Sequence, residues 1–337
     1  MKDYIRPLVQ TGPARPLGAQ TLAGGWAWFT HVEVLSRDAA PKVISASELT
    51  AAQLAPLVTP RVPMAGMSMA RPNLMGILNV TPDSFSDGGR FAAPEQAISH
   101  ARAMAEAGAD ILDIGGESTR PGAEEVPVEV EIARTAPVIA ALRGALKTPI
   151  SIDTRKSLVA AAALQAGANL VNDVAAMTFD HAIAKTAADA GAPICLMHAQ
   201  GDPQTMQDAP SYANVVLDVY DFIEERIEAA EQSGIPRDRI SIDPGIGFGK
   251  TLEHNLALLQ RLSIFHSLGC PILLGVSRKR FIGTLANEPQ ADRRMPGSVA
   301  VALAGVQQGA QILRVHDLAE TRQALTLFTA VTGGFSE

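Results

Sequence analysis

Eight short apolar runs recur along the chain from residue 74 onward, with longer and more polar segments between them. They cover 74–80, 110–115, 149–154, 169–174, 193–198, 239–243, 271–277 and 311–316. Each run has the length of a strand and is apolar at successive positions, which indicates burial of both faces. This pattern is typical of parallel strands covered by helices.

Ala-rich segments with helical spacing lie between most of these runs, the clearest being 94–107, 157–165, 182–190 and 299–308. These four segments lead into Gly108, Gly167, Gly191 and Gly309, where a left-handed residue ends a helix and the chain turns into the next strand. Eight such units in about 260 residues predict an α/β fold, a (β/α)₈ TIM barrel. An open doubly wound sheet is the alternative, but its usual Gly-x-Gly-x-x-Gly turn after the first strand is missing.

Residues 1–70 have a different character. They are predicted to form a small N-terminal α+β or hairpin appendage, a strand or hairpin plus a short helix, beside a barrel of residues 71–337. Prolines are frequent, and 25–35 alternates like a half-exposed strand that carries both tryptophans, Trp26 and Trp28. Ser45 and Glu48 have the spacing of a helix cap. Methionines at 64, 67 and 69 leave open a later start codon. If the appendage is peripheral, deletion of residues 1–68 leaves a soluble enzyme.

Composition narrows the class of protein. Of 337 residues, 47% are hydrophobic and 19% charged, as in soluble globular proteins, and the net charge of -7 argues against a general nucleic-acid or anionic membrane surface. A phosphorylated ligand therefore needs a local cationic pocket. Cys195 and Cys270 lie in apolar runs, which predicts reduced, buried thiols. We see neither a secretory signal nor a run of transmembrane length, so a cytoplasmic enzyme is expected.

Polar residues stand at the carboxyl end of every predicted strand. Active sites of such barrels form at this end, and an unpaired polar group buried there costs about 1–3 kcal/mol. We therefore expect a ligand site, although loop or cap residues explain any single position. The strand-end residues are Asn79, Asp113, Asp153, Asn172, His198, Asp243, Ser277-Arg278-Lys279, Arg314 and His316.

The strand-end residues divide by charge. Acceptors and an amide for a neutral heterocycle come from Asp153, Asn172 and Asp243. A carboxylate can accept two hydrogen bonds from a pair of donors on the edge of such a ring. Cations and donors for phosphate come from Arg120, Lys279, Arg314 and His316. No dedicated carboxylate cage is visible near Asn79, so Mg²⁺ held partly by substrate phosphates is favoured.

Three loops add candidates. The stretch 244–251, Pro-Gly-Ile-Gly-Phe-Gly-Lys-Thr, differs from a Walker A loop at Pro244; its glycines are expected to let the backbone approach a flat ligand on which Phe248 stacks. Met197 and Gly275 are expected to flank the same slot. Loops 80–92 and 115–127 follow the first two strands and are predicted to act as lids. Asp317 and Glu320 have a capping pattern that predicts a helix start.

Five motifs together resemble the signatures of the dihydropteroate synthase family. They are Ile-Leu-Asn-Val-Thr-Pro-Asp-Ser-Phe-Ser-Asp-Gly-Gly at 77–89, Asp-Ile-Gly-Gly-Glu-Ser-Thr-Arg-Pro-Gly at 113–122, Asp-Pro-Gly-Ile-Gly-Phe-Gly-Lys at 243–250, Ser-Arg-Lys at 277–279 and Arg-Val-His-Asp at 314–317. The resemblance covers about 72–330 and leaves out the appendage. One local departure is Ala199, where many members have Met.

The resemblance implies a transferase that joins 4-aminobenzoate to 6-hydroxymethyl-7,8-dihydropterin diphosphate and expels diphosphate. It implies Mg²⁺ on Asn79, these small-molecule substrates as partners, and a homodimer. Catalytic roles fall to Arg120, Lys279, Arg314 and His316. The implied pterin residues are Asp153, Asn172, Met197, Asp243, Phe248, Gly275 and Lys279; the diphosphate residues are Asn79, Thr119, Arg120, Arg314 and His316; the aminobenzoate residues are Thr119, Pro121, Phe248, Ser277 and Lys279.

Two alternatives keep the barrel but change the function. A methyltetrahydrofolate-dependent corrinoid methyltransferase would not call for Arg120, Arg314 and His316 around a diphosphate. A non-catalytic pterin-binding paralogue is expected to have lost Asn79, Arg120 or Lys279, and all three are present.

Overall fold

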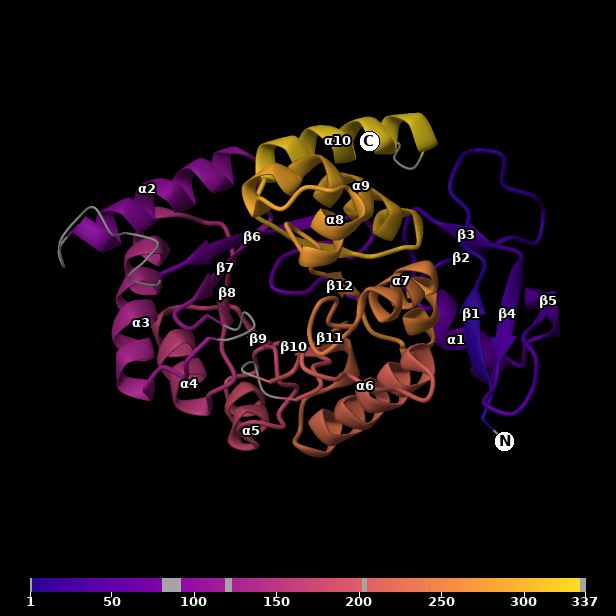
Figure 1. Cartoon of the computed structure of the whole chain (residues 1–337), viewed down its shortest axis with the longest axis horizontal. Helices are drawn as coiled ribbons and strands as arrows, with labels where there is room; N and C mark the ends of the chain where they lie inside the picture. The colour runs from indigo at the N-terminus through magenta and orange to yellow at the C-terminus, as the bar shows by residue number, and fades with distance from the viewer. Residues whose placement is uncertain (1, 81–91, 119–122, 202–204, 334–337) are drawn as a thin grey trace.

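The computed structural model describes residues 2–80, 92–118, 123–201 and 205–333. Its central element is a sheet of eight parallel strands in the order β11-β10-β9-β8-β7-β6-β13-β12. A bridge between Ile242 and Ile272 joins β11 to β12 and brings the two edges of the sheet together. The predicted (β/α)₈ barrel is confirmed, and the open sheet is excluded (Figure 1).

The barrel strands reproduce the apolar runs. They are β6 (Asn73–Asn79), β7 (Ile111–Gly115), β8 (Ile150–Asp153), β9 (Leu170–Asp173), β10 (Ile194–Met197), β11 (Ile240–Asp243), β12 (Leu273–Leu274) and β13 (Ile312–Val315). The seventh strand is shorter than predicted at both ends. Pro271 has no N–H to donate and Ile272 contributes only the bridge, and the strand ends at Leu274 instead of continuing to residue 277.

Helices cover the outside of the sheet. They are α2 (Ala92–Glu106), α3 (Val128–Ala145), α4 (Ser157–Ala166), α5 (Ala182–Asp189), α6 (Val215–Gln232), α7 (Leu252–Gln260), α8 (Arg280–Leu285), α9 (Met295–Gln307) and α10 (Leu318–Thr332), with 3₁₀ turns η3 (Arg237–Arg239), η4 (Leu262–Leu268) and η5 (Ala291–Arg294). The four predicted junction glycines, 108, 167, 191 and 309, all have positive φ.

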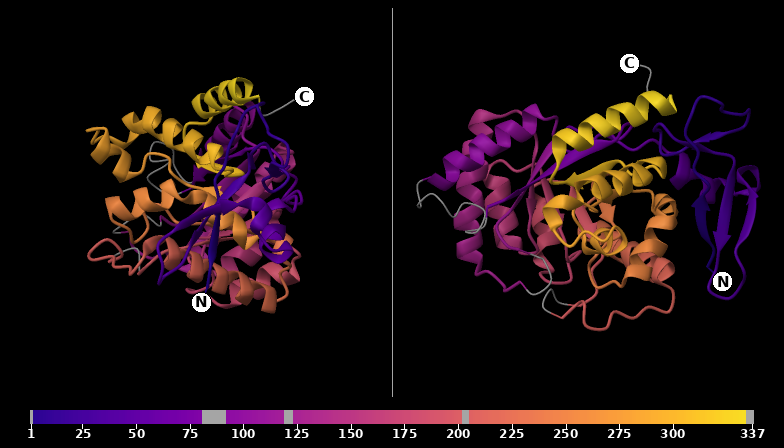
Figure 2. Two further views of the ribbon diagram at one scale, coloured as in Figure 1. Left: turned by 90° about the vertical axis from the view of Figure 1, so that its right-hand side faces the viewer. Right: turned by 45° about the horizontal axis from the view of Figure 1, so that its top comes forward.

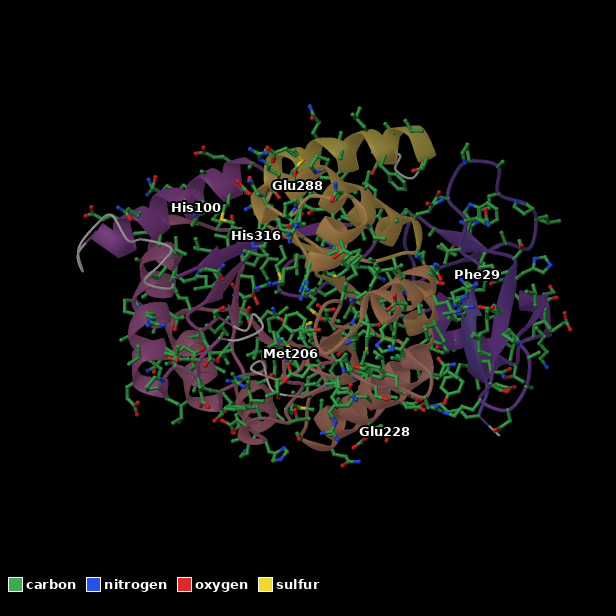
Figure 3. The ribbon with its side chains drawn as sticks, viewed as in Figure 1. Phe29, His100, Met206, Glu228, Glu288 and His316 are labelled. Carbon is green, nitrogen blue, oxygen red and sulfur yellow. The ribbon has the colours of Figure 1, made fainter. Side chains whose placement is uncertain are left out.

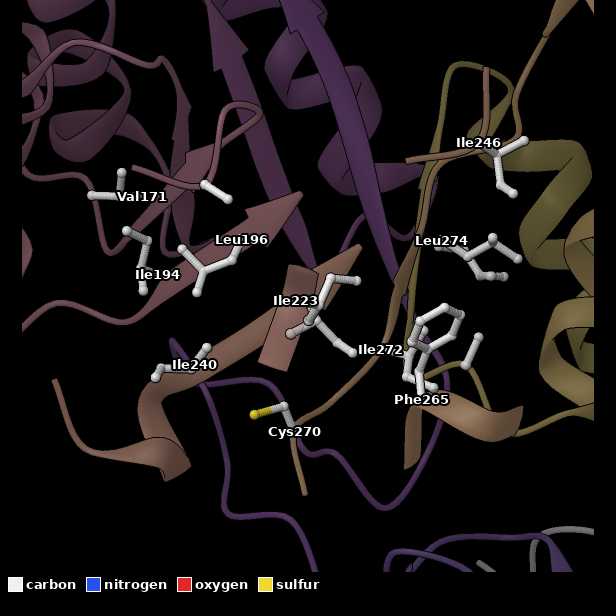
Figure 4. Close-up of a cluster of buried hydrophobic side chains, with 14 of the residues drawn as sticks. Val171, Ile194, Leu196, Ile223, Ile240, Ile246, Phe265, Cys270, Ile272 and Leu274 are labelled. Carbon is white, nitrogen blue, oxygen red and sulfur yellow. The ribbon is translucent and has the colours of Figure 1, made fainter. Parts of the chain in front are cut away.

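One buried cluster joins the barrel to its helices. Val171, Ile194, Leu196, Ile240 and Ile272 meet side chains from α6 and η4 there (Figure 4). Cys270 lies in this cluster, and both cysteines are buried free thiols, as predicted. None of the helices in the described ranges is long and apolar enough to cross a membrane.

The N-terminal residues form an antiparallel sheet beside the barrel, in the order β1 (Tyr4–Pro7), β4 (His31–Leu35), β5 (Lys42–Ser45). A hairpin of β2 (Gln20–Thr21) and β3 (Trp28–Phe29), a turn η1 (Ala46–Glu48) and α1 (Ala51–Val58) complete it. The strand character expected over 25–35 is divided between two strands: β3 pairs with β2, whereas β4 pairs with β1 and β5. The Ser45–Glu48 capping box is confirmed.

This N-terminal unit packs against α6, η4 and α9 (Figures 1 and 2). The Trp26 indole N–H donates to the Val306 carbonyl at 3.1 Å, and the Tyr4 hydroxyl donates to Asp221 Oδ2 at 2.8 Å. Arg37 pairs with Asp218 at 2.7 Å. Apolar packing and charge pairing therefore both hold the unit on the barrel.

A second contact closes the amino end of the barrel. Met64, Met67 and Met69 are almost fully buried against Met75, Ile111, Leu170, Cys195, Leu273 and Ile312, which lie at or near the first residues of their strands. We call these three side chains the methionine plug. The plug covers the end opposite the predicted site, so it supports the barrel without entering that site.

Candidate functional site

Strand register aligns the carboxyl ends of four neighbouring strands in one row, and three of the four aligned residues are polar. Asn79 is the partner of Gly115, Gly115 of Asp153, and Asp153 of Asn172. Asp243 pairs with Met197, and its backbone carbonyl accepts from the His198 amide at 3.0 Å. The apolar parts of the strands are buried, so their parallel order carries these side chains to the same rim.

Arg314 links three strands across this rim. Its Nε donates to Asp113 Oδ2 at 2.6 Å and its Nη2 donates to Asp153 Oδ2 at 2.7 Å. Asn172 donates to the same Asp113 oxygen at 3.1 Å. These contacts are not in the sequence-based assignment, which gave Arg314 to diphosphate and Asp153 to the pterin. Both ion pairs use Nε and Nη2, and neither uses Nη1.

Two buried carboxylates thus share one guanidinium. Burial raises the pKa of Asp153 to about 7, with Arg314 opposing the shift and Asp113 adding to it. The other carboxylate oxygens, Oδ1 of Asp113 and of Asp153, are buried and have no partner among the described residues. An unsatisfied acceptor in such a place is expensive, so the pair is suited to receive donors from a ligand.

Asp243 lies close to the same group. Its Oδ1 accepts from the Gly245 amide at 2.7 Å, and its Oδ2 faces Gly275, where a side chain would begin 3.5 Å away. Burial raises its pKa, while the Gly245 amide, Lys279, Lys250 and Arg314 act in the opposite direction. The absence of a side chain at Gly275 keeps space beside the carboxylate.

The Gly loop after Asp243 packs against the residues that follow β10. Gly245 and Gly249 have positive φ, and a Cβ at either would meet the backbone of His198 or Gln200. These two glycines therefore allow the loop to pack closely against the residues that follow β10. Lys279 Nζ lies 4.1 Å from the centroid of the Phe248 ring, a cation–π contact that places both predicted residues together.

Lys250 is a buried residue of this loop that sequence reasoning left without a role. Its ammonium lies 2.8 Å from His198 Nδ1 and donates to the Phe248 carbonyl at 3.0 Å. Burial, together with the Lys279 charge and against the attraction of Asp243, lowers the pKa of Lys250 to about 7. Burial and Lys250 lower that of His198 to about 2. Lys250 thus fastens the loop to the end of β10.

Residues 277–279 and 314–317 complete the rim. His316 Nδ1 lies 3.0 Å from the Ser277 hydroxyl (His316 is labelled in Figure 3). Arg278 has a φ of 59°, and its side chain pairs with Asp317 at 3.1 Å. Helix α10 begins after Asp317 as predicted, but the Asp317 side chain makes no cap bond because it binds Arg278.

The structure therefore gathers most of the predicted site residues. Asn79, Asp153, Asn172, Met197, Asp243, Phe248, Gly275, Ser277, Lys279, Arg314 and His316 are placed by the carboxyl ends of the strands or the loops that follow them. Thr119, Arg120 and Pro121 lie outside the described residues, as does most of the predicted lid at 80–92. Asp113 was noticed at a strand end but received no role, although its bond to Arg314 places it in the site.

The fold and rim define a (β/α)₈-barrel protein in which buried carboxylates and cationic side chains meet at the carboxyl ends of the strands. Comparison with known proteins gives a finer result. The pterin binding enzyme family model matches residues 75–316. Dihydropteroate synthase of Escherichia coli is 46% identical over 264 residues, covering 78% of this chain and 93% of that protein.

Solved structures agree. Dihydropteroate synthase of Xanthomonas albilineans with 4-aminobenzoic acid is 49% identical, with a TM-score of 0.76 and coverage of 81% of this chain and 98% of that one. The Yersinia pestis enzyme in a sulfonamide complex is 44% identical, also with a TM-score of 0.76, and 81% and 99% are covered. The chain belongs to the pterin-binding enzyme family, as a member of its dihydropteroate synthases.

Proposed function

We propose that this protein condenses 6-hydroxymethyl-7,8-dihydropterin diphosphate with 4-aminobenzoate to give 7,8-dihydropteroate and diphosphate. The observation that carries the proposal is the shared rim of Asp153, Asn172 and Asp243 with Arg314 and His316. Acceptors and an amide for the pterin edge lie there beside donors for the departing anion. The family relationship supports the same reaction.

The proposed reaction needs no nucleophilic side chain, because the amine of 4-aminobenzoate is itself the nucleophile. An aryl amine attacks by itself, and the barrier lies in breaking the C–O bond while negative charge develops on diphosphate. Arg314 and His316 are assigned to that charge, because preorganised donors act most strongly where charge develops in the transition state. Asp153, Asn172 and Asp243 orient the ring, and Phe248, Ser277 and Lys279 are assigned to the aminobenzoate side.

We assign Mg²⁺ to the diphosphate, with Asn79 as its protein ligand. The Asn79 Oδ1 atom lies over Gly115, which has no side chain to cover it, and an amide oxygen is a suitable hard donor. In the described ranges no three His, Cys, Asp or Glu side chains gather as a cation site, so the fit requires oxygens from the substrate and water. When bound, the ion would neutralise negative charge on the phosphates.

The family likeness also supports a homodimer and a cytoplasmic location as proposals. Two buried, unpaired thiols suit a reducing compartment. The charge of -7 supports neither nucleic acid nor an anionic membrane as a partner.

A release assay tests the reaction. The full chain is mixed with pterin diphosphate, Mg²⁺ and 4-aminobenzoate, and diphosphate is measured together with the mass of the pterin product. We expect release and dihydropteroate when all three components are present, and loss of both signals when 4-aminobenzoate is omitted. Intact pterin binding without turnover would favour the non-catalytic paralogue. Methyl transfer from methyltetrahydrofolate to a corrinoid would favour the methyltransferase.

A further inference from the structure

A buried ionic cluster lies at the base of the connection between β7 and α3. It consists of two acids, Glu117 and Glu131, and two bases, Arg155 and Lys156, all buried. The acids come from the start of the connection and from α3, and the bases lie directly before α4. The charges balance, and nothing in the proposed reaction uses them.

Lys156 is the centre of the cluster. Its ammonium donates to Glu117 Oε1 at 3.0 Å, to Glu131 Oε2 at 2.8 Å and to the Val126 carbonyl at 2.5 Å. An ammonium group has three protons, and each has an acceptor here. Glu131 also accepts from the Thr154 hydroxyl at 2.7 Å, which ties α3 to the turn after β8.

Glu117 completes a closed arrangement. Its Oε1 accepts from the Val126 amide at 2.8 Å, and its Oε2 accepts from Arg155 Nε at 3.2 Å. Burial acts to raise the pKa of Glu117, but the Val126 amide, Lys156 and Arg155 together hold it below its ordinary value. Glu117 and Lys156 therefore both bind Val126, nine positions after Glu117, and fix the two ends of one connection.

We call the hydrogen-bonded group of Glu117, Val126 and Lys156 the clasp. It lies close in sequence to residues assigned to both substrates. The connection between Glu117 and Val126 contains Thr119, Arg120 and Pro121, which the family resemblance assigns to aminobenzoate and diphosphate. Lys156 follows Asp153 by three residues, so the turn that presents a pterin carboxylate also carries the clasp. The hydrogen bonds of the clasp are made at the two ends of the connection, by Glu117 and Val126.

Stability alone is a weak reason for such a cluster. Burying four charges costs desolvation, and well-packed apolar side chains of similar volume often stabilise a fold equally or better. An ionic cluster adds a defined geometry, because each N–H donor is paired with one acceptor. Its contacts with both ends of the connection indicate that position is what it controls.

We propose that Lys156, acting through Glu117 and Val126, is a positioning residue for the substrate-binding connection between β7 and α3. The proposal rests on the proposed function for its kinetic consequence. Because the clasp fixes where the connection begins and ends, its loss weakens the use of 4-aminobenzoate while the pterin residues on the strands keep their places.

The test compares Lys156→Met and Glu117→Gln with Glu131→Gln as a matched control. Glu131 belongs to the same cluster but makes no hydrogen bond to Glu117 or Val126. In Lys156→Met we expect the KM for 4-aminobenzoate to rise at least tenfold, with the Kd of pterin diphosphate, measured by calorimetry, changed less than threefold. Amide hydrogen exchange at Val126 is expected to accelerate at least tenfold. Glu117→Gln is expected to shift both readouts in the same direction.

Glu131→Gln is expected to lower the melting temperature but to leave both the KM and Val126 exchange near the wild-type values. Equal kinetic effects in Lys156→Met and Glu131→Gln, or unchanged Val126 exchange in Lys156→Met, would overturn the positioning role. A wild-type chain that binds pterin diphosphate without releasing diphosphate would refute the proposed reaction instead. In that case Val126 exchange still decides whether the clasp holds the connection.

Discussion

Replacing Arg314 with alanine is expected to slow turnover at least 100-fold and to destabilise the fold. The rate falls because a preorganised donor is removed from the leaving-group side, a loss that typically costs about 10²–10³ in kcat. Stability falls because Asp113 and Asp153 lose their shared guanidinium. Breaking a buried ion pair on one side costs about 3–5 kcal/mol. The measurements are steady-state diphosphate release and urea unfolding.

A double variant separates the two effects. In Arg314→Ala combined with Asp113→Asn, one uncompensated carboxylate is gone, so part of the unfolding free energy should return. Turnover should stay low, because the donor is still missing. Recovery of turnover in the double variant would make Arg314 a structural residue only, and an unchanged rate in Arg314→Ala would remove it from the leaving-group site.

The second large effect is expected from the methionine plug. Each buried Met→Ala change costs about 2–5 kcal/mol, whereas a whole domain is stable by about 5–15 kcal/mol. Changing Met64, Met67 and Met69 together to alanine should therefore leave little or no folded protein at 25 °C. Urea unfolding followed by circular dichroism measures this, first in Met67→Ala alone and then in the triple variant.

Met295→Ala provides the control, since Met295 is only half-buried at the start of α9. It should cost clearly less than Met67→Ala. Deletion of residues 1–68 removes Met64 and Met67 from the amino end of the barrel. It is therefore expected to yield insoluble or unfolded protein, not the soluble enzyme expected of a peripheral appendage. A triple variant within 1 kcal/mol of the wild type would show that the plug is dispensable.

The sequence predicted the barrel because its evidence is local. Apolar runs, helical spacing and Gly167 or Gly309 at the helix ends are each readable within a few residues. The rim followed from the rule that strand ends meet, so Asp153, Asn172 and Asp243 could be expected together. The motifs then gave them chemical roles.

Contacts between distant positions could not be read in this way. Arg314 and Asp113 are 201 residues apart, and only the register of the closed barrel puts them within 2.6 Å. The methionine plug shows the same limit, because a Pro-rich segment carries no periodic signal for the barrel end that it covers. In the clasp, Lys156 looks in the sequence like an ordinary residue at the start of a helix. It is buried because Glu117, Val126 and Glu131, from the β7–α3 connection and α3, meet its ammonium.

Asp243 is expected to accept a hydrogen bond from a donor of the pterin ring at this rim. Calorimetric titration of pterin diphosphate into wild type, Asp243→Asn and Asp173→Asn tests it most directly. Asp173 is also a buried strand-end carboxylate, but both of its oxygens accept backbone amides, from Ala175 at 2.9 Å and Met177 at 2.6 Å. We predict a loss of affinity of about 100-fold or more in Asp243→Asn, at the upper end of a charged hydrogen bond, and near wild-type affinity in Asp173→Asn. Equal affinity in wild type and Asp243→Asn would contradict the assignment of the pterin to this rim.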